Sequence, residues 1–115
     1  MKLDPLFSSS APSSAVGRPA AHLETPALVV DLDVLDVNIA RLVDTAQRAG
    51  ARLRPHVKTH RMAEVARRLL AAGAKGICCA TVGEAETFAD AGCEDIFIAN
   101  QVVGAAPLSR LVAMA

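Results

Sequence analysis

Two histidines, an arginine and a lysine lie within seven positions, from Arg54 to His60, in the stretch RPHVKTH. In an extended strand the side chains alternate between two faces, so Arg54, His56 and Lys58 would share one face. A lysine beside other cations in a partly desolvated site loses its proton more easily, and its free amine can attack a carbonyl to form a Schiff base. The pattern therefore predicts an activated amine at Lys58, with Arg54 and His56 beside it.

Two other interpretations of this stretch are open. Its charges could be solvated at an exposed strand end, or His56 and His60, four positions apart, could hold a metal on one helix face. Pro55 and the lack of a glutamate after the first histidine, as in HExxH, argue against a zinc site. Since α/β barrels place their chemistry at the carboxyl ends of their strands, the position of the stretch favours a functional site.

The elements that must position these residues alternate along the chain from Glu24 onward. Short β-rich runs are followed by stretches with helical spacing, which indicates an α/β protein with a parallel sheet. Strands are expected at residues 27–30, 52–58, 76–80 and 95–99, and helices are expected to begin near Asp33, Met62, Thr81 and Pro107. The expected apolar stripes are Leu35, Ile39, Leu42 and Ala46 in the first helix, and Val65, Ala66, Leu69 and Leu70 in the second.

Glycines and one capping motif set the expected helix ends. Gly50, Gly73 and Gly92 are placed to end the first three helices. Thr81 and Glu84 form a T-x-x-E capping box at the start of the third. These signals support a series of βα units.

Two architectures fit such a series. A doubly wound nucleotide-binding sheet would require a glycine-rich phosphate loop, and neither GxGxxG nor GxxxxGK[ST] occurs in the sequence. A (β/α)8 barrel requires roughly 200 residues or more, so 115 residues could supply only part of one.

The composition favours a globular protein that binds small molecules. The 115 residues carry no formal net charge, and 52% of them are hydrophobic. No basic patch suits nucleic acid or an anionic membrane, and no apolar window suits a membrane span or a secretory signal. Cys78, Cys79 and Cys93 lack CxxC spacing, which favours reduced, buried thiols in a cytoplasmic protein. We expect residues 1–22, rich in Ser, Pro and Ala, to be a disordered tail preceding a domain at 23–115.

Four stretches together carry a family resemblance: TPALVVDLDVLDVNIARL, LRPHVKTH, GICCATVGEAE and DIFIANQVVG. They resemble the N-terminal part of the D-threonine aldolase and D-serine dehydratase family, relatives of alanine racemase with the fold type III, pyridoxal-phosphate-binding barrel. The resemblance implies that residues 23–115 form the first three to four βα units of a TIM barrel. It also implies that the run at 27–30 belongs to a C-terminal β-domain.

By the same resemblance, Lys58 carries pyridoxal 5'-phosphate. Together with the strand-face and strand-end arguments, this gives Lys58, His56, Arg54, Thr81 and Asn100 as the expected cofactor-binding residues. The implied full-length enzyme is a lyase that cleaves D-β-hydroxy-amino acids to glycine and an aldehyde, with this chain inactive alone. D-serine dehydratase-like β-elimination and a non-catalytic cofactor-binding module are the alternatives. A divalent metal is implied too, with its ligands beyond residue 115, and so is a homodimer.

Three polar positions near the strand ends have two interpretations each. Thr81 could cap a helix or reach the cofactor with its hydroxyl, and Asn100 and Gln101 could line the pocket or lie in a loop. Ala80 departs from the glutamine that some relatives cleaving hydroxyaspartate have at this position, which argues against a hydroxyaspartate substrate.

Overall fold

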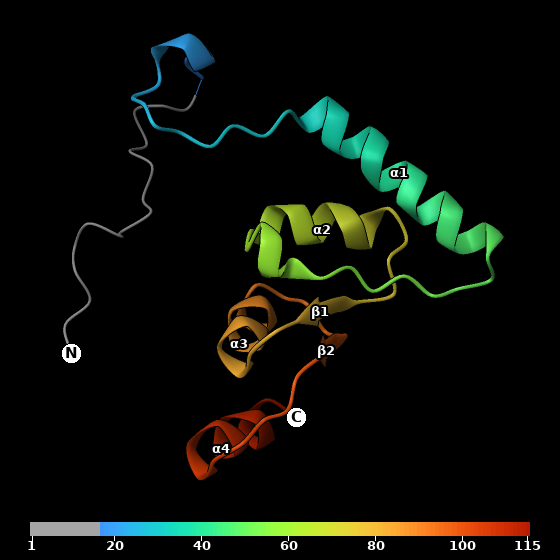
Figure 1. The fold of residues 1–115 in the computed structure, drawn as a ribbon, viewed down its shortest axis with the longest axis vertical. Helices are drawn as coiled ribbons and strands as arrows, with labels where there is room; N and C mark the ends of the chain where they lie inside the picture. Colours follow the sequence, from blue (N-terminus) through green and yellow to red (C-terminus); the bar gives the residue numbers. More distant parts are fainter. Residues whose placement is uncertain (1–16) are drawn as a thin grey trace. The chain divides into compact units, whose positions relative to one another are not determined.

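The computed structural model describes residues 17–115, and the chain divides into two units, Met1–Asp31 and Leu32–Ala115 (Figure 1). Most of the predicted tail, residues 1–16, lies outside the described part. The described residues of the first unit contain one short 3-10 helix, η3 (Ala20–His22). None of the described helices is long and apolar enough to span a bilayer.

The predicted strand at residues 27–30 is wrong. These residues form no strand, and Leu28, Val29 and Val30 are all exposed. Residues with high β propensity form a strand only where a neighbouring strand and an apolar surface receive them. No other segment within residues 17–115 pairs with this run.

The second unit begins with helix α1 (Leu32–Arg48), as the spacing predicts, although one member of the expected stripe is wrong. Ile39 and Val43 are buried, whereas Leu42 is exposed. Seen down the helix axis, Val43, four residues after Ile39, is rotated from it by about 40°, whereas Leu42, three residues after it, is rotated by about 60°. Val43 therefore lies nearer the buried side on which Ile39 lies. Helix α1 packs on α2 (Ala63–Ala71) through a small core that includes Val65 and Leu69.

The segment that precedes Lys58 is extended but forms only an isolated bridge, in which His56 pairs in parallel with Cys78. Cys78 N–H donates to the Pro55 carbonyl at 2.8 Å. Because proline has no N–H to donate, the ladder stays short. The chain then turns into the 3-10 helix η4 (Val57–Thr59). Lys58 therefore lies in this turn, and the prediction of a continuous strand through residue 58 is wrong.

Two strands of three residues form the sheet, β1 (Ile77–Cys79) and β2 (Ile96–Ile98). They pair in parallel, with Ile77 opposite Ile96 and Cys79 opposite Ile98. Both lie inside the runs expected to be strands. The parallel pairing, with a helix between the strands, agrees with the α/β prediction.

The remaining helices are α3 (Val82–Asp90), which contacts both strands, and α4 (Ala105–Met114), which contacts α3 (Figure 1). Helix α4 begins two residues before Pro107, which falls in its first turn, where a missing N–H costs no helical hydrogen bond. The core between sheet and helices consists of Val57, Ala66, Ile77, Cys79, Ala85, Phe88 and Cys93. All three cysteines are buried and free, as predicted.

Candidate active site

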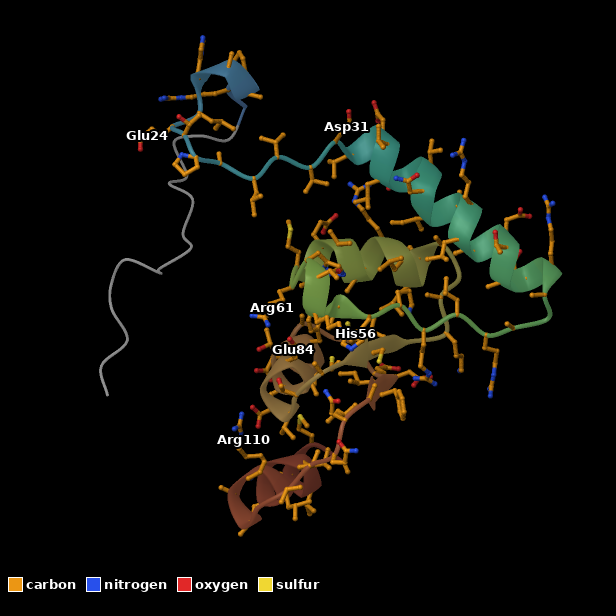
Figure 2. All side chains as sticks on the ribbon, viewed as in Figure 1. Glu24, Asp31, His56, Arg61, Glu84 and Arg110 are labelled. Carbon is orange, nitrogen blue, oxygen red and sulfur yellow. The ribbon has the colours of Figure 1, made fainter. Side chains whose placement is uncertain are left out.

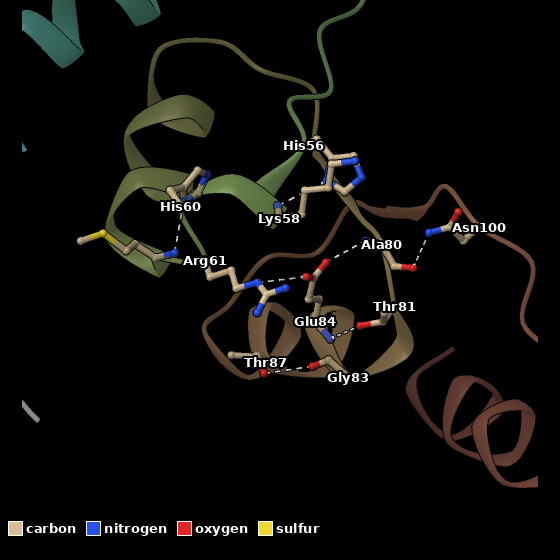
Figure 3. Close-up of polar contacts among 11 residues, drawn as sticks. His56, Lys58, His60, Arg61, Ala80, Thr81, Gly83, Glu84, Thr87 and Asn100 are labelled. Atoms are coloured by element: carbon tan, nitrogen blue, oxygen red, sulfur yellow. Dashed lines mark hydrogen bonds and ion pairs between the residues drawn. The ribbon is translucent and has the colours of Figure 1, made fainter. Parts of the chain in front are cut away.

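Three loops meet at the carboxyl end of the parallel segments. Lys58 follows the extended segment, Thr81 lies just beyond β1, and Asn100 lies just beyond β2 (Figure 3). Parallel strands direct their carboxyl ends to one edge, which is why residues about 20 positions apart are brought together. Four of the five residues predicted to contact the cofactor therefore lie at this end of the sheet: His56, Lys58, Thr81 and Asn100.

Lys58 is exposed, and the turn that carries it is capped by its neighbour. The Lys58 N–H donates to Nδ1 of His56 at 3.3 Å. The ring of His56 is half-buried, and Val57 between them is completely buried. The His56 hydrogen bond and the burial of Val57 therefore hold the backbone at Lys58 in place.

Arg54 does not lie beside Lys58, so the prediction of a shared strand face is wrong. Arg54 forms a two-pronged ion pair with Asp95, with Nη2 donating to Oδ2 at 2.9 Å. Asp95 directly precedes β2, so this pair lies at the amino end of the sheet. The hydrogen bond from Arg54 lowers the pKa of Asp95. A guanidinium paired in this way is held at the edge opposite Lys58, and its contact with the cofactor stays a prediction.

Thr81 is the N-cap of α3, as the capping box predicts. Its Oγ1 accepts a hydrogen bond from Glu84 N–H at 3.1 Å. The hydroxyl proton is still available for donation, since a threonine hydroxyl both donates and accepts. Capping therefore does not prevent Thr81 from also contacting a ligand.

Both backbone groups of Ala80 are taken by side chains of other residues. Its N–H donates to Oε2 of Glu84 at 2.8 Å, and its carbonyl accepts from Nδ2 of Asn100 at 2.8 Å (Figure 3). Glu84 thus bonds the residue before the cap rather than Thr81 itself, a variation on the usual capping box. Asn100 ties the loop after β2 to the loop after β1, while Gln101 is exposed.

Sequence reasoning missed Arg61 and the burial of His60, which follow Lys58. His60 Nδ1 accepts from Met62 N–H at 3.1 Å, while its buried Nε2 has no hydrogen-bond partner among the described residues. Burial lowers the pKa of His60. Arg61 has φ of 51°, unusual for a residue with a side chain, and its Nε lies 3.3 Å from Oε1 of Glu84. No pattern in the sequence signals this left-handed turn.

The chemistry of these side chains fits a small cofactor that carries an aldehyde and a phosphate. A primary amine, an imidazole, a hydroxyl and an amide are collected at one edge of the sheet. The amine can bind the carbonyl, and the others can donate hydrogen bonds to anionic oxygens. Within residues 17–115, no cluster of three or more His, Cys, Asp or Glu side chains could hold a metal ion.

Comparisons with known proteins agree with this picture. A family model described as alanine racemase, N-terminal domain, matches residues 30–114. D-threonine aldolase of Arthrobacter sp is 46% identical over 100 residues, covering 87% of this chain and 26% of the relative. D-threo-3-hydroxyaspartate dehydratase of Delftia sp. strain HT23 is 51% identical over 77 residues, covering 67% of this chain and 20% of the relative.

A solved structure is also similar. The crystal structure of D-threonine aldolase from Filomicrobium marinum matches with a TM-score of 0.82 and 43% identity, covering 84% of this chain and 26% of that one. The chain therefore spans about a fifth to a quarter of the length of these relatives.

Proposed function

Because this chain belongs to the alanine racemase N-terminal domain family, we propose that it is the N-terminal part of a pyridoxal-phosphate-dependent lyase acting on D-β-hydroxy-amino acids. Residues 32–115 would then be the first βα units of its (β/α)8 barrel. The observation that carries the proposal is the exposed Lys58, which follows the segment that bridges to β1 and so lies at the same end of the sheet as Thr81 and Asn100. The favoured reaction is cleavage to glycine and an aldehyde, because a relative with 46% identity is a D-threonine aldolase.

Each residue at this edge has a proposed role. Lys58 would hold the cofactor through its ε-amine, with His56 fixing the turn below it. Thr81 and Asn100 would donate hydrogen bonds to the cofactor. When bound, pyridoxal phosphate supplies an electron sink for the bond that breaks at the substrate.

The rest of the enzyme lies outside the described residues. We propose that a divalent metal is held by residues beyond position 115, and that the full-length protein is a cytoplasmic homodimer. The 115-residue chain alone would be inactive, because it lacks those ligands.

A second candidate reaction is β-elimination, as in a D-serine dehydratase. A dehydratase with 51% identity over 77 residues supports it. Incubating the full-length protein with D-threonine, D-serine and threo-3-hydroxyaspartate separates the two, since an aldolase releases glycine and a dehydratase releases ammonia. Ala80 is the sequence argument for expecting little activity on hydroxyaspartate. Cofactor binding without any of these products would indicate a non-catalytic module.

Borohydride reduction of the full-length protein with pyridoxal phosphate tests the role of Lys58. Reduction fixes the cofactor to the amine that binds it, and peptide mass mapping identifies that amine. We expect the adduct on Lys58, its absence in Lys58→Arg, and a loss of turnover in that variant of at least about 100-fold. Lys75→Arg is the matched control, because Lys75 is an exposed lysine near Asp95 at the opposite edge. An adduct spread over several lysines and unchanged in Lys58→Arg would refute the proposal.

A further inference from the structure

The segment after Lys58 is held by a side chain from another element. Arg61, three residues beyond Lys58, forms an ion pair with Glu84 in the first turn of α3, and Figure 2 shows the two side chains facing each other. Glu84 also accepts the hydrogen bond from Ala80 N–H. One carboxylate therefore joins the turn that carries Lys58 to the loop after β1.

We call the Arg61–Glu84 ion pair the tether, and the exposure of its two side chains suits that role. The side chain of Glu84 is 12% exposed, whereas that of Arg61 is 72% exposed. The carboxylate is thus fixed against the fold by burial and by Ala80, while Arg61 reaches it from the surface. A pair with one mostly buried member is screened less by solvent than the Arg48–Asp44 pair on α1, whose side chains are 78% and 53% exposed.

The backbone at Arg61 also needs such a contact. Its φ of 51° is a conformation that a residue with a side chain adopts only where its surroundings impose it. The Arg61 N–H donates to the Val57 carbonyl at 2.8 Å, which closes the turn around Lys58. The ion pair holds the side chain of the same strained residue, so backbone and side chain together fix residues 57–61.

We propose that Glu84 is a positioning residue for Lys58. It acts through Arg61, and holds the Lys58 turn in register with the loop that carries Ala80 and Thr81. The inference rests on the proposed function, since it concerns how the cofactor-binding amine is aimed.

Two substitutions in the full-length protein remove the tether in different ways. Glu84→Gln keeps an acceptor for Ala80 N–H but loses the ion pair. Arg61→Gly loses the ion pair but relieves the left-handed backbone, so its fold is not strained further. Glu86→Gln is the matched control, because Glu86 lies on the same helix and pairs with Arg110 instead.

Amide hydrogen exchange without cofactor measures the tether itself. We expect exchange in residues 58–62 to rise about threefold to fivefold in Glu84→Gln and Arg61→Gly, the change that losing one partly exposed ion pair produces. Exchange elsewhere should stay as in wild type, and Glu86→Gln should leave residues 58–62 unchanged. Equal exchange in all four proteins would overturn the inference.

The rate of borohydride-trapped adduct at Lys58 then measures the consequence for the amine. We expect slower labelling in both tether variants and wild-type labelling in Glu86→Gln. Faster exchange with unchanged labelling would overturn the positioning role, leaving Glu84 only a structural part. If wild-type Lys58 takes no adduct at all, the proposed function fails, whereas the exchange result still decides whether Glu84 holds the turn.

Discussion

At the scale of single residues, the buried thiols are the clearest case of chemistry controlled by surroundings. Cys79 is completely buried beneath the site, and burial, with the nearby charge of Glu84 adding to it, raises its pKa from 9.0 to about 11. The pKa of Cys93 is raised as well, mainly by burial. These thiols therefore stay protonated at physiological pH and are poor nucleophiles, which supports the prediction that they serve as core residues.

The raised pKa of Cys79 predicts how stability depends on pH. The folded protein retains the thiol proton up to about pH 11, whereas the unfolded chain begins to lose it near pH 9.0. The stabilisation is thus fully present below pH 9.0 and is lost as the pH rises through about 11. Urea unfolding at a series of pH values should show wild type losing more stability across this window than Cys79→Ala. Parallel curves for the two proteins would contradict the assignment.

At the scale of elements, the amino end of the sheet depends on one glycine. A Cβ atom at Gly76 would lie 2.3 Å from the Asp95 carbonyl oxygen and 2.8 Å from Arg54 Nη1. Both neighbours are fixed, because Asp95 O accepts from Ile77 N–H and the Arg54 guanidinium is paired with Asp95. Any side chain at Gly76 must therefore displace the junction between β1 and β2.

We expect Gly76→Ala to lower the free energy of unfolding by about 1–3 kcal/mol, the usual cost of overpacking. Gly83→Ala is a matched control on α3. Its new Cβ would meet Arg110 at an ordinary 3.6 Å, so a gain of about 0.5–1 kcal/mol in helix stability is expected. Urea midpoints measure both changes, and similar midpoints for the two variants would show that the contact at Gly76 is not rigid.

The sequence could predict features that depend on residues close together in the chain, but not features that depend on residues far apart in it. The cap at Thr81 and the helices α1 to α4 depend on neighbours a few positions away, and local patterns found them. The placement of Arg54 depends on Asp95, which is 41 positions away, and alternation along a strand could not reveal that partner.

The missed turn at Lys58 has a similar cause. The strand pattern of the preceding residues continues through Lys58, but Pro55 limits the ladder and the His56 ring captures the Lys58 N–H. The side chain of the left-handed Arg61 pairs with Glu84, again from a distant element. Where contacts across elements decide the backbone, local propensity is overruled.

At the scale of the whole second unit, apolar surface is left uncovered beside β2. A groove of about 720 Å³ lies between β2, α3 and α4, and its lining includes Ile96, Ile98 and Met114. Within the described residues β2 pairs only with β1, so its other edge is open, and Phe97 on that strand is 55% exposed. An open strand edge beside an apolar groove favours association.

The 115-residue chain alone should therefore self-associate. We expect its sedimentation coefficient to rise with concentration between about 1 and 100 μM, and Phe97→Lys to reduce that rise, because a charge on an edge strand opposes pairing. In the full-length protein we propose that further barrel strands cover this edge. Chains should then not associate through β2, and Phe97→Lys should not change how the sedimentation coefficient varies with concentration. A concentration-independent monomer for the 115-residue chain would contradict the prediction.

Because both backbone groups of Ala80 are hydrogen-bonded by other residues, its side chain can be replaced without moving the loop. Since Glu84 and Asn100 hold both its N–H and its carbonyl, the main chain at this position is fixed by neighbours rather than by its own side chain. The methyl group is half-buried at the edge where substrate would bind under the proposed function. Mutation can thus exchange the side chain at position 80 while the loop keeps its path. Substrate preference and folding are thereby separable traits here, which makes position 80 a natural starting point for directed evolution.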